Sequence, residues 1–228
     1  SEPIIRVTDL WKSYEVDGSG VAALRGTYLE IGRGERVALL GKSGSGKSTL
    51  FNLIAGLDRP TKGRIEIEGQ DLEALGDKGR TTLRRTKIGF IFQFFNLLPT
   101  LTVFENVYLS LELANKPDPE LALKALKGVG LEGKERRFPN ELSGGEQQRV
   151  AIARALFKNP KIVFADEPTG NLDRENGFLV LEMMTRMIRE MGVTLILVTH
   201  DREIAIRADK IIELVDGRIC KAFRVKDT

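Results

Sequence analysis

A short segment after an apolar run carries the residues needed to hold a polyphosphate. Residues 41–48 read Gly-Lys-Ser-Gly-Ser-Gly-Lys-Ser and fit G-x-x-x-x-G-K-[ST] at every fixed position. Glycines let the backbone wrap around phosphate oxygens, and the positive N-terminal end of the following helix attracts the same anion. The pattern predicts that Lys47 reaches the β- and γ-phosphates and that the Ser48 hydroxyl coordinates Mg²⁺. A glycine-rich turn with an accidental lysine is the alternative.

Two carboxylates at the end of a later apolar run suit metal binding and proton transfer. Mg²⁺ takes oxygen ligands and keeps several waters, so Asp166 is expected to bind it directly or through water. Glu167 is expected to orient or deprotonate the water that attacks the γ-phosphate. An Asp-Glu pair by itself is typical of a helix N-cap. The phosphate loop in the same chain favours the catalytic interpretation.

A second glycine-bearing segment, Ser143-Gly144-Gly145-Glu146, follows about a hundred residues after the phosphate loop. It matches the S-x-x-E capping box, so it predicts the start of a helix over 146–158. A helix start with two glycines also exposes backbone N–H groups and a positive dipole end, which suits a γ-phosphate docking from outside. Both interpretations can hold together.

These segments are similar to the motifs of the ABC ATPase family, and the resemblance covers nearly the whole chain. The motifs stand in the family's order: Gly41–Thr49 resembles Walker A, Gln93 the Q-loop glutamine, Leu142–Glu146 the signature, Ile162–Glu167 Walker B, Asn171–Asp173 the D-loop and His200 the switch histidine. In the family the signature closes on the ATP held by a partner subunit. The resemblance therefore implies ATP hydrolysis, ATP and Mg²⁺ as cofactors, and a homodimer that sandwiches two ATP molecules.

The resemblance also assigns roles to individual residues. The catalytic roles it implies fall on Glu167, His200, Gln93 and Lys47, and the Mg²⁺ ligands on Ser48, Gln93 and Asp166. The nucleotide contacts it implies are Tyr14, Gly41, Lys42, Ser43, Gly44, Ser45, Gly46, Lys47, Ser48, Thr49, Ser143, Gly144, Gly145, Glu146 and Asp173. Tyr14 stands where the family stacks an aromatic ring on adenine, with an ordinary strand tyrosine as the alternative. His200, the only histidine, is otherwise a structural residue at a strand end.

Within the family, residues 92–102 and 165–173 are similar to the subgroup of LolD, MacB and FtsE. That subgroup implies a separate integral-membrane permease and work such as export, extraction of lipoproteins or lipids, or force transmission. Lys42 and Phe95 replace residues common in the family, and neither departure touches a residue that the family needs for hydrolysis. The apolar run 94–98 is a candidate permease contact, with burial in the chain's own core as the alternative.

Four apolar runs are expected to position these residues as buried parallel strands. They cover residues 37–40, 88–92, 162–165 and 193–198, and each is followed by polar residues able to do chemistry. Ligands of open α/β sheets sit beyond the carboxyl ends of the strands. The sequence therefore predicts one site built along one edge of a sheet, without any use of the family resemblance.

The remaining pattern predicts an α/β fold of the P-loop NTPase type, with a RecA-like parallel-sheet core, an N-terminal antiparallel β-subdomain and an inserted helical subdomain. Strand-like alternation runs from Ile4 to Ile31, with a hairpin loop at 17–20, and residues 62–69 predict a short strand pair. Helices are expected at 50–55, 103–114, 120–127 and 175–191. One domain over 1–228 is expected, with a catalytic core at 1–92 and 159–228 and a helical signature subdomain at 93–158.

The methionines at 183, 184, 187 and 191 lie at helical spacing, which favours a core face over a soft partner-binding face.

Composition argues against several partners. The net charge of +3, from 35 basic and 32 acidic residues, is too weak to indicate nucleic acid, and the basic clusters at 84–87 and 134–137 are typical of solvated faces. No apolar run approaches the ~20 residues of a membrane span. The N-terminal residues do not resemble a signal peptide, and Cys220 is the only cysteine. A peripheral place on the cytoplasmic side of the inner membrane is expected, with no nucleic-acid partner.

Three rival functions stay open at this level. A soluble ABC ATPase acting on nucleic acid or ribosomes would carry a long coiled-coil insertion or two ATPase halves, and neither occurs here. An FtsE-like envelope complex without transport uses the same ATP site, so the sequence separates it poorly. A P-loop kinase would leave the signature and His200 unexplained.

Overall fold

The computed structural model describes residues 2–16 and 19–225 and divides into two compact units. The first unit comprises Ser1–Arg84 and Thr194–Thr228, and the second comprises Arg85–Val193. The hairpin loop expected at 17–20 includes residues 17 and 18, which lie outside the described residues.

The N-terminal half of the first unit is an antiparallel sheet with the strand order β2-β1-β4-β5. Its strands are β1 (Ile5–Val16), β2 (Ser19–Ile31), β4 (Lys62–Ile67) and β5 (Gln70–Asp71). The alternation predicted for residues 4–31 is thus confirmed as two paired strands. The strand pair expected within 62–69 is wrong: these residues supply only β4, which pairs with β1 and with β5. The turn that reverses the chain falls at Glu68 and Gly69, so the second strand of the pair lies beyond the expected range, at Gln70–Asp71.

The second group of strands in the first unit surrounds β3 (Arg36–Leu40), which pairs in parallel with β8 (Thr194–Thr199) and with β9 (Lys210–Val215). Strand β10 (Arg218–Arg224) pairs with β9 in antiparallel fashion. Every residue of β8 is buried, as expected for a strand covered on both faces. The predicted strands did not include β9 or β10. Strand β10 is exposed along most of its length, whereas Ile211, Ile212 and Leu214 of β9 are buried.

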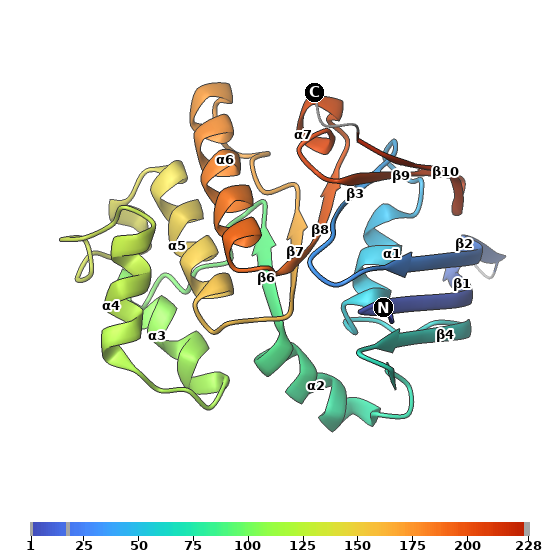
Figure 1. The fold of residues 1–228 in the computed structure, drawn as a ribbon, viewed down its shortest axis with the longest axis horizontal. Coiled ribbons are helices and arrows are strands. Elements are labelled where there is room, and N and C mark those ends of the chain that lie inside the picture. The colour runs from blue at the N-terminus through green and yellow to red at the C-terminus, as the bar shows by residue number, and fades with distance from the viewer. Residues whose placement is uncertain (1, 17–18, 226–228) are drawn as a thin grey trace. The chain divides into compact units, whose positions relative to one another are not determined.

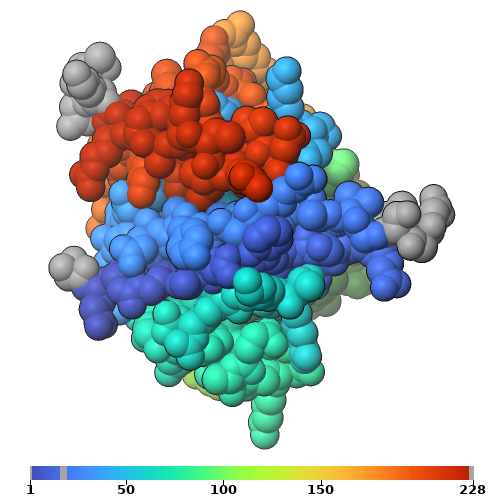
Figure 2. All heavy atoms as spheres, turned by 90° about the vertical axis from the view of Figure 1, so that its right-hand side faces the viewer, coloured from blue at the N-terminus to red at the C-terminus, as the bar shows by residue number. Residues whose placement is uncertain are grey.

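Helix α1 (Lys47–Ile54) packs against β1, β2 and β8, so it joins the two groups of strands into one core. Its buried face includes Leu50, Phe51, Leu53 and Ile54. Figure 2 views the first unit from one side: the N-terminal strands form a blue band, with the red C-terminal strands on one side of it and the teal residues of β4 on the other. The short helix α7 (Arg202–Ala205) packs on β3 and β8.

Helix α2 (Gly76–Lys87) was not predicted from the sequence because it has no apolar stripe. Its buried residues are Leu83 and Arg80, and the guanidinium of Arg80 is held by the carboxylates of Glu73 and Asp77. Ion pairs therefore contribute more than hydrophobic burial to holding this helix. Such contacts leave no hydrophobic periodicity in the sequence from which the helix could be predicted.

The second unit contains the parallel strands β6 (Ile88–Phe92) and β7 (Ile162–Asp166) and the helices that follow them. These helices are α3 (Val103–Leu113), α4 (Pro119–Gly128), the 3₁₀ turn η1 (Pro139–Glu141), α5 (Gly144–Leu156) and α6 (Arg174–Glu190). Figure 1 labels the two strands and the four α-helices of this unit. Helix α5 is central to this unit, because it packs on α3, α4, α6 and β6.

Side-chain caps set the N-terminal boundaries of these helices. Thr102, Asp118, Ser143 and Asp173 each accept a backbone N–H of the first turn that follows. Of the methionines expected to form a core face on α6, Met184 is fully buried, whereas Met191 caps the helix C-terminus and is 39% exposed. The core interpretation is therefore confirmed for Met184 and wrong for Met191, because the helix ends before the apolar stripe reaches it.

Candidate functional site

The predicted phosphate loop lies in the first unit between β3 and α1. The side chain of Lys47 turns back into the loop, where its Nζ donates to the carbonyl oxygens of Gly41 at 2.6 Å and Lys42 at 2.9 Å. Helix α1 begins at Lys47, and its N-cap residue, Gly46, provides no side-chain cap hydrogen bond to the first turn. The loop thus gathers an ammonium group and uncapped backbone N–H groups, which is the chemistry of a polyphosphate site.

Close packing explains why glycine occupies two of these positions. A Cβ on Gly41 would lie 2.5 Å from Ser45 Oγ and 2.6 Å from the carbonyl oxygen of Leu214. Gly46 has a φ of +101°, and a Cβ there would lie 2.7 Å from the carbonyl oxygen of Ala23. The loop is therefore wedged between β2 and the hairpin of β9 and β10.

His200 lies at the same strand edge as the phosphate loop. Strands β3 and β8 are parallel, with Leu40 opposite Thr199, so Gly41 and His200 are the next residues along neighbouring strands. The side chain of His200 is exposed. The expectation that strand-end residues meet at one edge is thus confirmed for this pair within the first unit.

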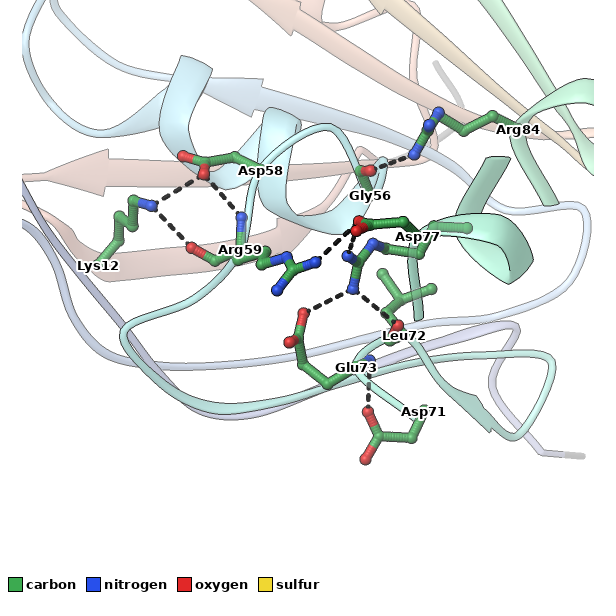
Figure 3. A network of polar contacts seen from close by, with 10 residues as sticks. Lys12, Gly56, Asp58, Arg59, Asp71, Leu72, Glu73, Asp77 and Arg84 are labelled. Carbon is green, nitrogen blue, oxygen red and sulfur yellow. Dashed lines mark hydrogen bonds and ion pairs between the residues drawn. The ribbon is translucent and has the colours of Figure 1, made fainter. Parts of the chain in front are cut away.

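Tyr14 lies on β1, and its ring is held from two directions. Its hydroxyl donates to Asp58 Oδ2 at 3.0 Å, and the Nζ of Lys12 lies 4.8 Å from the ring centroid. Lys12 also donates to Asp58 Oδ1 at 2.9 Å and to the carbonyl oxygen of Arg59 at 2.7 Å (Figure 3). The ring is therefore fixed, although 39% of the residue is exposed.

The pKa directions agree with this arrangement. Burial raises the pKa of Tyr14, and its neighbour Asp58 raises it further. Burial alone would raise the pKa of Asp58, but hydrogen bonds from Lys12, the Arg59 N–H and Tyr14 outweigh it and lower that pKa. An ionised Asp58 thus holds both the Tyr14 hydroxyl and the Lys12 ammonium at neutral pH.

Gln93 and the two predicted carboxylates come together at a strand edge of the second unit. Strands β6 and β7 are parallel with Phe92 opposite Asp166, so Gln93 and Glu167 are the next residues of neighbouring strands. Glu167 has a φ of +44°, an unfavourable backbone conformation for a residue with a Cβ. Such strain clusters at sites where a side chain must be aimed in one direction, which is a reason to regard Glu167 as functional.

The side chain of Gln93 lies over the loop that follows β7. Its Nε2 donates to Asn171 Oδ1 at 3.1 Å. A Cβ on Gly170 would lie 2.6 Å from the same nitrogen, so glycine leaves the space that the amide fills. The predicted Q-loop and D-loop residues are therefore in direct contact within this unit.

The segment Ser143–Glu146 starts α5 with the predicted capping box. Ser143 Oγ accepts from the Glu146 N–H at 3.3 Å, and Glu146 Oε2 accepts from the Ser143 N–H at 3.0 Å. Lys134 also pairs with Glu146, and its hydrogen bond is the largest cause that lowers the pKa of this carboxyl, followed by the bond from the Ser143 N–H. Gly144 and Gly145 are half-buried. The capping interpretation is confirmed, and the predicted nucleotide contact of this segment stays a prediction.

Asp173 is an N-cap as well. Its carboxylate accepts from the Asn176 N–H at 3.0 Å and from Asn176 Nδ2 at 2.6 Å. The bond from Asn176 Nδ2 is the largest cause that lowers the pKa of this aspartate. The structure thus gives Asp173 a helix-starting role, and its communication across a dimer stays a prediction.

Four residues around these groups were not singled out from the sequence: Lys12, Asp58, Gln148 and Arg154. Gln148 had a detectable signal, since it is a polar residue on the apolar face of a predicted helix. Lys12, Asp58 and Arg154 had no such signal, because their roles come from hydrogen bonds to residues that are distant in the sequence.

Among residues 2–16 and 19–225, no three side chains of His, Cys, Asp or Glu converge on a point that would bind a metal ion. Over the same residues, no helix is long and apolar enough to cross a membrane.

A phosphate loop after a buried parallel strand, with a strained glutamate at the end of another, defines a P-loop nucleotide-binding protein. The sequence profile of the ABC transporter family matches residues 24–170, more than half of the chain. The chain belongs to this family and is an ATP-binding, ATP-hydrolysing subunit of an ABC transporter.

Relatives and solved structures agree with this assignment. The chain is 45% identical to the lipoprotein-releasing system ATP-binding protein LolD of Pseudomonas fluorescens, over 95% of this chain and 96% of the relative. It is 47% identical to an uncharacterized ABC transporter ATP-binding protein of Thermotoga maritima, over 95% of this chain and 93% of the relative.

The fold is likewise similar to that of the ATP-binding cassette MJ0796, solved as a dimer in a post-hydrolysis state bound to ADP and Pi. The TM-score is 0.89 at 40% identity, covering 98% of this chain and all of the other. The structure of cbiO1 from Clostridium perfringens, part of the complex cbiONQ, gives a TM-score of 0.86 at 32% identity, covering 99% of this chain and 90% of the other. The predicted fold class is confirmed.

Proposed function

We propose that this chain drives a membrane ABC complex by binding and hydrolysing ATP as a pair of identical copies. Each ATP would be held by the phosphate loop of one copy and by residues Ser143–Glu146 of the other. The observation that carries the proposal is that the chain contains both halves of such a site. One is the phosphate loop, where Lys47 bonds to the loop carbonyls and helix α1 has no side-chain cap, and the other is the separate helix start with two glycines. The dimeric structures of the similar cassette MJ0796 support the pairing of copies.

The nucleotide contacts proposed in the first unit are Tyr14, Gly41, Lys42, Ser43, Gly44, Ser45, Gly46, Lys47, Ser48 and Thr49. The fixed, partly exposed ring of Tyr14 supports stacking on adenine. The loop geometry around Lys47 supports binding of the phosphates. In the second unit, Asp173 is proposed to act across the paired copies.

For hydrolysis, we assign the general base to Glu167, since it directly follows β7 and has a strained, left-handed backbone conformation. Gln93, His200 and Lys47 complete the proposed catalytic set. Gln93 is positioned by Asn171, and His200 is exposed at the edge where the phosphate loop begins. These residues orient water and stabilise charge on the γ-phosphate, which are the main demands of phosphoryl transfer.

We propose Mg²⁺ as the second cofactor, with Ser48, Gln93 and Asp166 as its protein ligands. These residues offer a hydroxyl, an amide oxygen and a carboxylate, the hard oxygen donors that Mg²⁺ prefers. The Ser48 side chain is exposed, and the Nε2 of Gln93 is the atom bonded to Asn171, so its amide oxygen is the atom available as a ligand. When bound, Mg²⁺ would neutralise charge on the β- and γ-phosphates.

The proposed partner is a separate integral-membrane permease, which would place the chain at the cytoplasmic side of the inner membrane. Phe94 is 72% exposed and Leu98 is 44% exposed, so the run 94–98 is not buried wholly in the chain's own core. We propose this run as the permease contact, within a helical signature subdomain at 93–158 beside a catalytic core at 1–92 and 159–228. The similarity to LolD supports extraction or export of lipoproteins or lipids as the work done.

The test of hydrolysis compares Glu167→Gln with Glu175→Gln, a carboxylate in the first turn of α6. Loss of a general base costs about 10²–10⁴-fold in rate, so Glu167→Gln should retain ATP binding, lose turnover and form an ATP-dependent dimer. Glu175→Gln should hydrolyse ATP at the wild-type rate. Wild-type turnover by the Glu167→Gln protein would contradict the assigned base.

The partner is tested by capture of the tagged chain from detergent-solubilised membranes of its host, followed by mass spectrometry. A polytopic membrane protein with a large extracytoplasmic domain is expected. Recovery of a membrane protein of the cell-division complex would instead support force transmission without transport. Recovery of ribosomal or DNA-bound proteins without a membrane partner would overturn the permease assignment and leave the ATPase intact.

A further inference from the structure

A single buried amide connects the two strand ends of the second unit. Gln148, on the second turn of α5, has no exposed surface. Its Nε2 donates to the carbonyl oxygen of Phe92 at 3.2 Å and to that of Pro168. A primary amide has two N–H donors, and Gln148 uses both on backbone carbonyls that belong to different loops.

These carbonyls flank the proposed catalytic side chains. Phe92 immediately precedes Gln93, and Pro168 immediately follows Glu167. The parallel register places Phe92 opposite Asp166, so the two loops leave the sheet at the same level. The amide of Gln148 thus binds the backbone directly beside Gln93 and directly beside Glu167.

The same helix begins with the signature segment. Ser143 caps α5, and Gln148 lies five residues further on, about 7.5 Å along a rigid helix axis. A displacement of the helix start is therefore transmitted through Gln148 to both loops without passing through a flexible segment.

Simple packing does not account for this residue. The neighbouring inward positions of α5 are apolar, including Val150, Ile152 and Ala153, and an apolar side chain would bury here without a polar atom of its own to satisfy. Gln148 instead keeps its Oε1 buried, and that oxygen has no donor among the residues that the structure describes. A buried unsatisfied oxygen is unfavourable, so the two N–H bonds are the feature that requires glutamine.

We propose that Gln148 is a positioning residue for ATP hydrolysis: it fixes Gln93 and Glu167 relative to the helix that starts at Ser143, so that the signature segment and the hydrolytic side chains move as one body. The proposal rests on the roles assigned above to these residues. Its consequence is a defect in turnover without a matching defect in nucleotide binding, because the phosphate loop belongs to the other unit.

The test replaces the amide in two ways in the full chain. Gln148→Glu keeps the shape but removes both donors when ionised, and Gln148→Met removes them with an apolar side chain of similar length. The matched control is Gln147→Glu, since Gln147 is the neighbouring residue and its Nε2 donates to the carbonyl oxygen of Leu142, outside both loops. The measurements are kcat for ATP, the dissociation constant for a non-hydrolysable ATP analogue, and Tm.

Both Gln148 variants should lose about tenfold or more in kcat, the size of effect expected when catalytic groups are displaced by a fraction of an ångström. The dissociation constant should stay within about threefold, and the control should resemble wild type. Wild-type kcat in both variants would overturn the proposal. So would a proportional loss of nucleotide binding or of the folded protein in both variants, since the amide would then support the unit as a whole.

The Glu167→Gln protein, measured in the same series, separates this inference from the proposed function. If Glu167→Gln abolishes turnover while the Gln148 variants remain fully active, the assigned base stands and only the positioning role fails. If the Glu167→Gln protein turns over ATP at the wild-type rate, the assignment of Glu167 as general base is wrong, and this result does not depend on the Gln148 variants.

Discussion

Gln93 and Asn171 are 78 residues apart in the chain, yet the Nε2 of Gln93 donates to Asn171 Oδ1 at 3.1 Å. The contact passes over Gly170, where a Cβ would lie 2.6 Å from that nitrogen and 2.8 Å from the Cδ of Gln93. The residue proposed to orient water and Mg²⁺ is therefore aimed by the loop that follows the strand carrying Glu167.

Gly170→Ala should displace the Gln93 side chain, since the added methyl occupies its present position. We expect ATP hydrolysis to fall on the order of tenfold or more, because small displacements of catalytic groups have effects of this size. Stability should change little, since the clash is with the end of a flexible side chain. Steady-state ATPase assays and thermal unfolding check both points.

Gly20→Ala is the control for this substitution, because a Cβ at Gly20 meets no atom of the described residues within 4 Å. Equal activity of the Gly170→Ala protein and wild type would show that the Gln93 position does not limit hydrolysis.

Asp58 is predicted to strengthen nucleotide binding at the adenine base and not at the phosphates. Asp58→Ala removes the acceptor of the Tyr14 hydroxyl and of Lys12, so the ring loses its fixed orientation. An aromatic stacking arrangement is worth about 0.5–1.5 kcal/mol, so the dissociation constant for ATP should rise about twofold to tenfold. The affinity for inorganic tripolyphosphate, which has no base, should not change. Calorimetric titration measures both.

Asp77→Ala is the matched control, since Asp77 belongs to the same polar network but contacts Arg59 (Figure 3). It also contacts Arg80. It should leave the preference for ATP over tripolyphosphate intact. A loss of tripolyphosphate affinity in the Asp58→Ala protein would assign Asp58 to the phosphate loop instead.

Glu146 should contribute a pH-dependent part of stability. Its folded-state pKa is lowered below the ordinary 4.5, first by Lys134 and then by the Ser143 N–H. The stabilisation is thus fully present above about pH 4.5 and is lost as pH falls through the lowered folded-state pKa. Glu146→Gln should lower the free energy of unfolding by about 1 kcal/mol at pH 7, and this difference should shrink in acid. Urea unfolding across pH 3–7 measures it.

Glu132→Gln provides the comparison, because the Lys127–Glu132 pair has side chains that are 69% and 66% exposed. Such a pair contributes less than about 1 kcal/mol, and the loss should be smaller than for Glu146. A Glu146→Gln difference that stays constant from pH 7 to pH 3 would contradict the assigned linkage.

Arg154 is predicted to stabilise the backbone conformation of residues 94–98, the proposed permease contact. Its guanidinium donates to the carbonyl oxygens of Phe95 at 2.8 Å and Asn96 at 2.6 Å, both of which have positive φ. Lysine lacks the fork that reaches two adjacent carbonyls. Arg154→Lys should therefore cost about 1–2 kcal/mol of stability and speed amide hydrogen exchange across residues 94–98.

Arg149→Lys, on the same helix, is the control for Arg154→Lys, since Arg149 donates to the single carbonyl of Val129 at 3.5 Å. Unchanged exchange at residues 94–98 in the Arg154→Lys protein would remove Arg154 as the anchor of this segment.

The sequence by itself determined the chemistry and most of the elements. The phosphate loop, the carboxylates at 166 and 167 and the capping box at Ser143 are contiguous patterns, and the strands before them are apolar runs. Local propensity and burial fix such segments, so they can be read without a partner. Helix α2 and the edge strand β10 were missed because ion pairs and edge pairing, not periodic burial, hold them in place. Strand β9 is different, since it lies between β10 and β3 with Ile211, Ile212 and Leu214 buried, and its short apolar run was not recognised.

Only the tertiary structure decided which residues aim the functional groups. Lys12 meets Asp58 across 46 residues, and Gln148 meets Phe92 across 56 residues. A hydrogen bond of this kind depends on where two backbones lie after folding, and neither residue's local sequence carries that information. The sequence thus specifies the reactive groups, whereas long-range packing specifies the directions in which they point.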